Sequence, residues 1–149
     1  MIGKRLSPFV VLLADDEPAD AHLVKWALTE NRLHVDLQHV LDGREALEYL
    51  QREGRRFAMA VRPDLILIDL NMPRMDGREF LAVVKGDPAL CDIPVVVLST
   101  SEVDRDVRDS YRLGASGYIT KALDVNEFIV EIRQLSEYWI SLVRLPENR

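Results

Sequence analysis

Four short apolar runs of this sequence each end in residues that could take part in chemistry. The residues at or just after their ends are Asp15, Asp16, Asp69, Ser99 and Lys121. Clustered carboxylates supply the oxygen ligands that Mg²⁺ prefers, and a single carboxylate can attack phosphorus to form an acyl phosphate. An ammonium group and a hydroxyl beside them could neutralise and hold the added phosphoryl group. These residue types therefore predict a metal-assisted phosphoacceptor site.

The elements that carry these side chains must bring them to one place. The runs at 9–14, 65–68 and 95–98 are short and show no apolar–polar alternation, which predicts strands buried on both faces of a parallel sheet. Because parallel strands end on the same edge of a sheet, we expect the acids, the hydroxyl and the lysine to meet there. Open α/β sheets bind their ligands at that edge.

Strands and helices are expected to alternate along the chain. The expected strands cover about 9–14, 34–40, 65–69, 94–99 and 117–121, and the expected helices cover about 18–31, a segment starting at 42–43, 77–85, 102–113 and 124–144, with a loop at 54–62. This order predicts an α/β fold: a flavodoxin-like, doubly wound five-stranded parallel sheet in the order 2-1-3-4-5 with a long C-terminal helix. We expect a single domain over 1–149, which includes a helical extension at about 136–149.

The composition limits the class of protein. The chain has 149 residues, a net charge of −6 and one cysteine, Cys91. An acidic chain without a basic stripe binds nucleic acid poorly, and a lone cysteine fits a reducing compartment. No run approaches the ~20 apolar residues of a membrane span, and the first apolar run is too short for a signal peptide. We therefore expect a cytoplasmic protein with no nucleic-acid or membrane partner.

Taken together, the motifs resemble the receiver domain of two-component response regulators. The matching motifs are Asp15-Asp16, Asp69-Leu70-Asn71-Met72-Pro73 with Met75-Asp76-Gly77, Ser99 after the run at 95–98, and Gly114-Ala115 with Gly117-Tyr118 before Lys121. The resemblance covers about residues 8–135. It implies a switch protein, not an enzyme, that accepts a phosphoryl group from a histidine kinase on Asp69 and uses Mg²⁺ as its cofactor.

The three acids are expected to form the metal site. Asp16 and Asp69 would ligate Mg²⁺ directly, and Asp15 would act through water. The resemblance adds the backbone carbonyl of Asn71 as a further ligand. A cation is expected on physical grounds as well, since two unit charges 4 Å apart at a protein surface repel by about 4 kcal/mol. One such acid would most simply be a solvated turn residue, but three beside Lys121 favour a site.

Three further residues are expected to complete the switch. The Lys121 ammonium would neutralise phosphoryl charge, and Ser99 would donate a hydrogen bond to a phosphoryl oxygen, with Thr100 as its rival. The resemblance makes Tyr118 an aromatic rotor that turns inward, whereas strand propensity alone makes it an ordinary core residue. Ala122 departs from the family, which usually has a cis proline there. A cis bond before a non-proline residue costs roughly 2.5–4 kcal/mol, so we expect a trans Lys121–Ala122 bond.

Other functions remain to be weighed against the switch. A phosphorelay intermediate would pass its phosphoryl group on to a second histidine. A phosphatase with an aspartyl nucleophile needs a second acid two residues after Asp69, but that position is Asn71. A receiver that has lost phosphorylation is disfavoured by the intact acids, and a DNA-binding regulator by the short segment after the last expected helix.

The C-terminal segment is unusually apolar. Its sequence from 132 to 146 and the insert at 52–63 resemble stand-alone regulators paired with bacterial phytochrome histidine kinases, which makes such a kinase the expected partner. A helix reaching residue 144 would extend past the sheet and expose apolar residues, and such a patch marks an interface. The residues expected in a homodimer interface are Trp139, Ile140, Leu142, Val143 and Leu145. The alternative is that this segment folds back onto its own domain.

Overall fold

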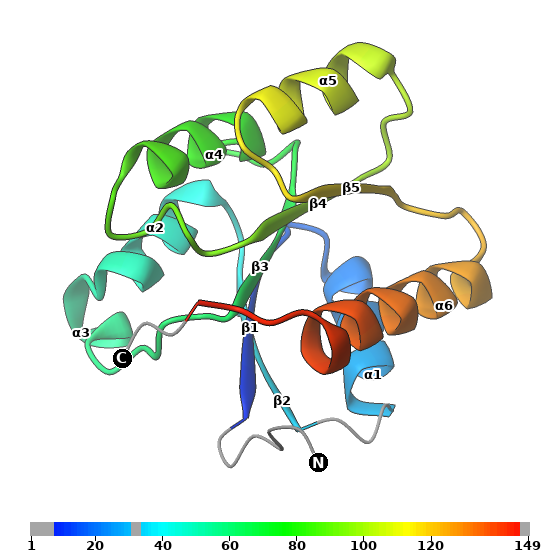
Figure 1. Cartoon of the computed structure of the whole chain (residues 1–149), viewed down its shortest axis with the longest axis horizontal. Helices are drawn as coiled ribbons and strands as arrows, with labels where there is room; N and C mark the ends of the chain where they lie inside the picture. The colour runs from blue at the N-terminus through cyan, green and yellow to red at the C-terminus, as the bar shows by residue number, and fades with distance from the viewer. Residues whose placement is uncertain (1–7, 31–33, 147–149) are drawn as a thin grey trace.

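A five-stranded parallel sheet lies between two layers of helices (Figure 1). The computed structural model describes residues 8–30 and 34–146. The strands are β1 (Phe9–Ala14), β2 (Val35–Val40), β3 (Leu65–Asp69), β4 (Val95–Ser99) and β5 (Gly117–Thr120). Their order in the sheet is β2-β1-β3-β4-β5, and each neighbouring pair is parallel. The predicted flavodoxin-like architecture is therefore confirmed.

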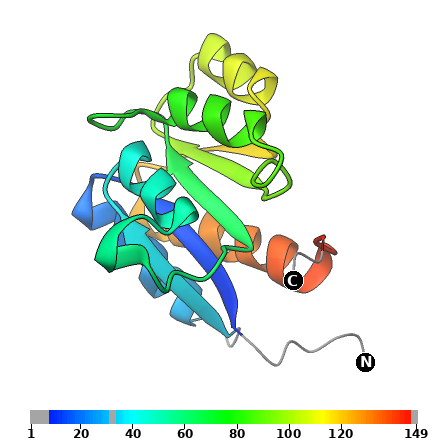
Figure 2. The ribbon, with the colours of Figure 1, turned by 90° about the vertical axis from the view of Figure 1, so that its left-hand side faces the viewer.

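The helices divide between the two faces of this sheet. α1 (Pro18–Glu30) and α6 (Val125–Ser136) pack together on one face, and α2 (Gly43–Gln51), α4 (Gly77–Gly86) and α5 (Asp104–Arg112) lie on the other (Figures 1 and 2). Since successive side chains of a strand point to opposite faces, β3 serves both layers. Ile66 and Ile68 belong to the core under α2 and α4, while Leu65 and Leu67 belong to the core under α1 and α6.

Aspartates fix the starts of three helices. The side chain of Asp42 accepts a hydrogen bond from the N–H of Glu45 at 2.8 Å and caps α2. Asp76 and Glu79 form a reciprocal capping box at the start of α4. Asp124 caps α6 by accepting a hydrogen bond from the N–H of Glu127 at 3.0 Å. An aspartate at this position satisfies backbone N–H groups that have no partner within the helix, so these local signals set where each helix begins.

The segment predicted as a loop over 54–62 begins with a short helix, α3 (Gly54–Phe57), so that prediction is wrong at its start. Gly54 has φ +73°, a left-handed conformation that glycine adopts readily, and it turns the chain into α3. Phe57 is buried and packs edge to face on Tyr49, with ring centroids 5.5 Å apart. The end of the first helix predicted near residue 31 lies outside the described residues.

The C-terminal helix is present but ends differently from the prediction. α6 ends at Ser136 and continues as a π-helix, η1 (Glu137–Leu142), so the helical segment stops two residues before the expected residue 144. The N–H of Val143 donates to the carbonyl of Tyr138, five residues earlier, at 2.9 Å. Val143 itself has an extended backbone, which ends the helical segment.

The segment after α6, residues 137–146, is called the tail here, and it partly folds back onto its own domain. Trp139, Ile140 and Leu145 pack against the core under α1 and α6. Leu145 also lies near the segments that lead into β3 and β4, at Pro63 and Ile93. In Figure 2 the red tail lies beside the orange helix α6 and far from the yellow-green α5. The apolar surface that the helix was expected to expose beyond the sheet is therefore smaller than predicted.

Within residues 8–30 and 34–146, no helix is long and apolar enough to cross a membrane.

Candidate functional site

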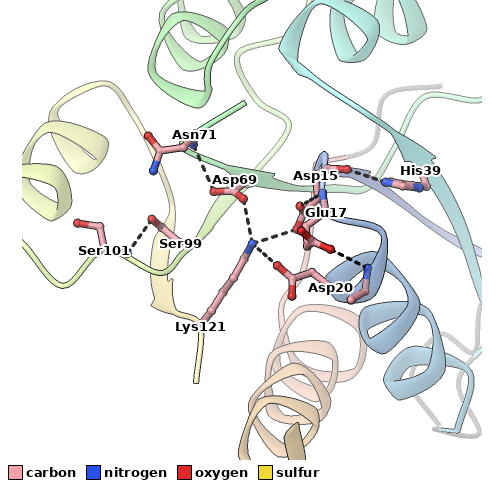
Figure 3. A network of polar contacts seen from close by, with 10 residues as sticks. Asp15, Glu17, Asp20, His39, Asp69, Asn71, Ser99, Ser101 and Lys121 are labelled. Carbon is pink, nitrogen blue, oxygen red and sulfur yellow. Dashed lines mark hydrogen bonds and ion pairs between the residues drawn. The ribbon is translucent and has the colours of Figure 1, made fainter. Parts of the chain in front are cut away.

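The predicted site residues meet at the carboxyl edge of the sheet (Figure 3). Asp15 directly follows β1, Asp69 ends β3, Ser99 ends β4 and Lys121 directly follows β5. Figure 3 shows Lys121 reaching between Asp15 and Asp69. The sequence alone predicted this convergence, because it depends on strand ends and parallel order alone.

Lys121 is the centre of the ionic network. Its Nζ atom donates to Asp69 Oδ2 at 2.9 Å, to Asp15 Oδ2 at 3.0 Å and to Asp20 Oδ2 at 2.7 Å. Asp20 was missed by the sequence analysis. It lies in the first turn of α1, which starts at the same sheet edge. An acidic residue in the first turn of the predicted helix was the sequence signal that could have identified Asp20.

The charges in this network are unbalanced. Burial opposes the charge of Lys121, but the hydrogen bond to Asp20 and the charges and bonds of Asp15 and Asp69 outweigh it, so the pKa of Lys121 is raised above its ordinary value. Burial also raises the pKa of Asp15, although a hydrogen bond from the N–H of Glu17 and the charge of Lys121 oppose it. Three carboxylates surround this one ammonium group, so ionised acids outnumber the lysine in the network.

The residues present fit a divalent cation. One carboxylate oxygen from each of Asp15, Asp16 and Asp69 lies within 4.8 Å of the others. Asp15 is buried and Asp16 is exposed to solvent. Oxygen ligands from one or two carboxylates, completed by water, are the ligand set that Mg²⁺ takes in proteins. Asn71 lies beside them, and its backbone N–H donates to Asp69 Oδ1 at 3.3 Å.

The loop after Asp69 is held tightly. A Cβ atom on Gly77 would lie 2.5 Å from the backbone oxygen of Asp69, so only glycine allows α4 to start this close to the site. Arg74 has φ +62° and forms two hydrogen bonds with the carboxylate of Asp42, at 2.8 and 3.2 Å. The contacts of Arg74 join the loop to the start of α2.

Ser99 and its rival Thr100 lie in different environments. Ser99 is fully buried at the end of β4, next to β3, and its Oγ atom accepts a hydrogen bond from the N–H of Ser101 at 3.1 Å. Its hydroxyl proton therefore remains available to another acceptor. Thr100 is exposed. The burial of Ser99 between β3 and β5 favours it as the hydroxyl of the site.

Tyr118 and the peptide bond after Lys121 were also singled out by the sequence. Tyr118 is partly buried against the core under α2 and α4, and its hydroxyl donates to the carbonyl of Ser101 at 2.9 Å. The ring thus lies inward, a position that fits both interpretations of this residue. The Lys121–Ala122 bond is trans, as predicted, since the described residues contain no cis peptide bond.

A doubly wound 2-1-3-4-5 sheet with clustered acids, a hydroxyl and a lysine at its carboxyl edge defines the phosphoacceptor class of signalling domain. The family profile of the response regulator receiver domain matches residues 11–133. The chain belongs to this family. Its members are signalling proteins of two-component systems that act with histidine kinases and bind Mg²⁺ in their acidic pocket.

Individual relatives are similar over nearly the whole chain. Response regulator Rcp1 of Synechocystis sp. (strain ATCC 27184 / PCC 6803 / Kazusa) is 40% identical over 139 residues, which cover 93% of this chain and 94% of Rcp1. The crystal structure of the phosphorylated cyanobacterial phytochrome response regulator RcpA superposes with a TM-score of 0.90 at 42% identity, covering 95% of this chain and 100% of RcpA. The Mn²⁺-bound form of Rcp1 gives a TM-score of 0.89 at 39% identity, covering 94% and 100%.

Proposed function

We propose that Asp69 accepts a phosphoryl group from a histidine kinase and that its phosphorylation switches partner binding or assembly. The observation that carries this proposal is the position of the Asp69 carboxylate. It ends a buried strand, receives a hydrogen bond from Lys121 at 2.9 Å and has a carboxylate oxygen within 4.8 Å of one from each of Asp15 and Asp16. Attack of a carboxylate oxygen on phosphorus gives an acyl phosphate and releases the kinase histidine as the leaving group.

The surrounding residues have separable tasks. Asp15, Asp16 and Asp69 would hold Mg²⁺, together with the carbonyl of Asn71. The bound cation supplies charge neutralisation and orients the phosphoryl oxygens. Lys121 already lies on Asp69 and would pair with the charge of the new group, about −1.5 to −2. The buried hydroxyl of Ser99 would donate to a phosphoryl oxygen, which would transmit phosphorylation to the segment after β4.

Acetyl phosphate tests the phosphoacceptor directly. Incubation with acetyl phosphate and Mg²⁺ should add one phosphoryl group, detected by intact mass, and Asp69→Asn should abolish it. Asp104→Asn makes the same chemical change at an exposed position of α5 and should leave labelling intact. Unchanged labelling of Asp69→Asn would rule out this assignment. Ser99→Ala should still be labelled, but its assembly or partner binding should no longer change on phosphorylation.

Melting curves test the metal site. A cation that binds the folded state raises the melting temperature by mass action, so millimolar Mg²⁺ should stabilise the native chain. Asp16→Asn should lose more of this gain than Asp15→Asn, because Asp15 is expected to act through water. Native melting curves that do not respond to Mg²⁺ would show that the acids hold no metal.

The proposed kinase is of the phytochrome type. Support comes from the similarity to Rcp1 and RcpA, which extends across 93–95% of the chain. Transfer from a phosphorylated phytochrome-type kinase should be at least tenfold faster than transfer from a histidine kinase of an unrelated system. Equal transfer rates from the two kinases would contradict this pairing. Retention of the label in the presence of a histidine phosphotransfer protein would distinguish an endpoint from a relay intermediate.

The proposed assembly is a homodimer formed through the tail. Leu142 and Tyr138 are 74% and 51% exposed, and Val143 is half-buried, whereas Trp139, Ile140 and Leu145 already contact their own domain. Exposed apolar side chains next to each other favour an interface. Light scattering should detect a dimer in the native chain and a monomer in a chain ending at Glu137. A native chain that stays monomeric at tens of micromolar, with and without phosphorylation, would exclude it.

A further inference from the structure

Ser101 connects the site hydroxyl to Tyr118. Its backbone N–H donates to Ser99 Oγ at 3.1 Å, and its backbone carbonyl accepts from the Tyr118 hydroxyl at 2.9 Å. Figure 3 shows Ser101 directly beside Ser99, on the side away from Lys121. The position of this one residue therefore sets the geometry of two predicted switch residues at once.

The side chain of Ser101 is held by a different group of residues. Its Oγ atom donates to Asp106 Oδ2 at 2.5 Å and accepts from the N–H of Val103 at 3.2 Å. Asp106 lies in the first turn of α5, and its other carboxylate oxygen pairs with the guanidinium of Arg78 on α4. The three side chains of Arg78, Asp106 and Ser101 thus join α4 and α5 to the loop after β4.

We infer that Asp106 is a positioning residue, paired with Arg78, that holds Ser101 so that Ser99 is aligned with the site and Tyr118 is kept inward. Nothing in the sequence motifs marks these residues, because Asp106 lies in the charged run 102–109, which reads as solvated helix surface, and Arg78 is a single arginine after Gly77. Their effect is indirect, because neither side chain forms a hydrogen bond or ion pair with Asp69 in the described residues, and both act through the loop that carries Ser99.

Charge-assisted hydrogen bonds explain how this network can bias the loop. A carboxylate that accepts from a hydroxyl and a guanidinium forms stronger and better-directed bonds than neutral groups do. The Arg78 and Asp106 side chains are 31% and 25% exposed, so water competes only in part. The hydrogen bond from Ser101 lowers the pKa of Asp106, with help from the charge of Arg78 against partial burial. The carboxylate is therefore ionised at neutral pH.

The consequence for signalling rests on the proposed function. If phosphorylation of Asp69 draws Ser99 toward the site and favours the inward ring, the network favours that arrangement before phosphorylation. Removing the network should lower the population of the aligned state. By population-shift linkage, the rate at which acetyl phosphate labels Asp69 should then fall by roughly three- to tenfold in Asp106→Ala, while the final extent of labelling is retained, as in Ser99→Ala.

Fluorine NMR of the full chain, with 3-fluorotyrosine in place of tyrosine, tests the positioning without phosphorylation. The chain has four tyrosines, and Tyr118→Phe identifies the resonance of Tyr118. Asp106→Ala and Ser101→Ala should shift or broaden that resonance in the same direction, and the double variant should shift it no further. Asp104→Ala removes a neighbouring acid from the same helical turn and should leave it unchanged.

The outcomes separate the two proposals. A Tyr118 resonance in Asp106→Ala that coincides with the native one would overturn the positioning role, whatever happens to labelling. A shifted Tyr118 resonance in a chain that acetyl phosphate cannot label would support the positioning role and refute the phosphoacceptor. If Asp106→Ala disturbs all four tyrosine resonances, the Tyr118 resonance in Ser101→Ala and in Arg78→Ala decides whether the positioning role holds. Each of these variants removes one end of the network.

Discussion

Helices α5 and α6 follow each other in the chain on either side of β5, yet they are attached to the domain in different ways. α6 buries four large apolar side chains, Phe128, Ile129, Ile132 and Leu135. Of the described residues of α5, Ser110 is the one that is buried. α5 is held instead by polar groups, chiefly Asp106, which bonds to Ser101 and pairs with Arg78.

The difference indicates where a switch can operate. Apolar burial is worth about 25 cal/mol per Å² and does not depend on charge, so α6 is expected to stay in place when charge is added at the sheet edge. Hydrogen bonds and ion pairs at partly exposed positions contribute little each and can be exchanged for others. Elements that move in regulation come from the least stable parts of a fold, and α5 has that character here.

The largest effect should come from the core contact of α6. Ile132 is fully buried, and Ile132→Ala should lower the free energy of unfolding by about 2–5 kcal/mol through lost burial and the cavity left behind. Val107→Ala on α5 removes a half-buried side chain and should cost less than about 1.5 kcal/mol. Urea denaturation measures both changes. Equal losses would show that α5 is anchored by apolar contacts after all.

A second prediction concerns local opening. Amide hydrogen exchange should show that α5 opens without global unfolding, with opening free energies at least about 1–2 kcal/mol below those of α6. The core amides of α6 should exchange near the global limit because Phe128 and Ile132 hold them. Protection factors at residues 107–112 that match those at 128–135 would contradict the contrast between the two helices.

The sequence predicted the sheet and the acid cluster because both depend on local patterns. Buried strands read as unbroken apolar runs, and parallel order places Asp15, Asp69 and Lys121 at one edge regardless of how the helices pack. Helix starts were also predictable, since Pro18 and Asp42 carry local signals for them. These features need no knowledge of contacts between distant side chains.

The residues that the sequence did not predict depend on long-range packing. Asp20 joins the site because α1 starts at the sheet edge where Lys121 lies, and the two residues are 101 positions apart along the chain. The network of Arg78, Asp106 and Ser101 requires α4 and α5 to lie side by side. The π-helical turn at Glu137–Leu142 has no local sequence signal that separates it from an α-helix, and its Trp139 and Ile140 pack against the core under α1 and α6.

A substitution at Ser110 should have a smaller effect than those above, and it should stabilise α5 instead of destabilising it. Its hydroxyl donates to the carbonyl of Asp106, four residues earlier, at 2.8 Å. Such bonds to the preceding turn do not strengthen a helix, and alanine has the higher helix propensity, by about 0.5 kcal/mol. Ser110→Ala should therefore slow the opening of α5 about twofold in hydrogen exchange. Ser136→Ala alters a serine with a similar bond on α6 and should leave α5 exchange unchanged. Faster α5 exchange in Ser110→Ala would show that this hydroxyl stabilises the helix.

The smallest effect should be a pH dependence confined to α5. The hydrogen bond from Ser101 and the charge of Arg78 lower the pKa of Asp106 below its unfolded value, against partial burial. A lowered pKa means that the ionised form stabilises the fold above the unfolded pKa, about 3.9, and that this contribution is lost as the pH falls through the folded value.

The hydrogen-exchange protection of α5 should therefore decline as the pH is lowered from 5 toward 3. Because other carboxylates titrate in the same range, Asp106→Asn is the reference. In Asp106→Asn, the protection of the α5 amides should decline less between pH 5 and pH 3 than it does in the native chain. The protection of the α6 amides should change equally in the two chains. A native chain and an Asp106→Asn chain with superimposable pH profiles at α5 would mean that the charge of Asp106 does not hold this helix.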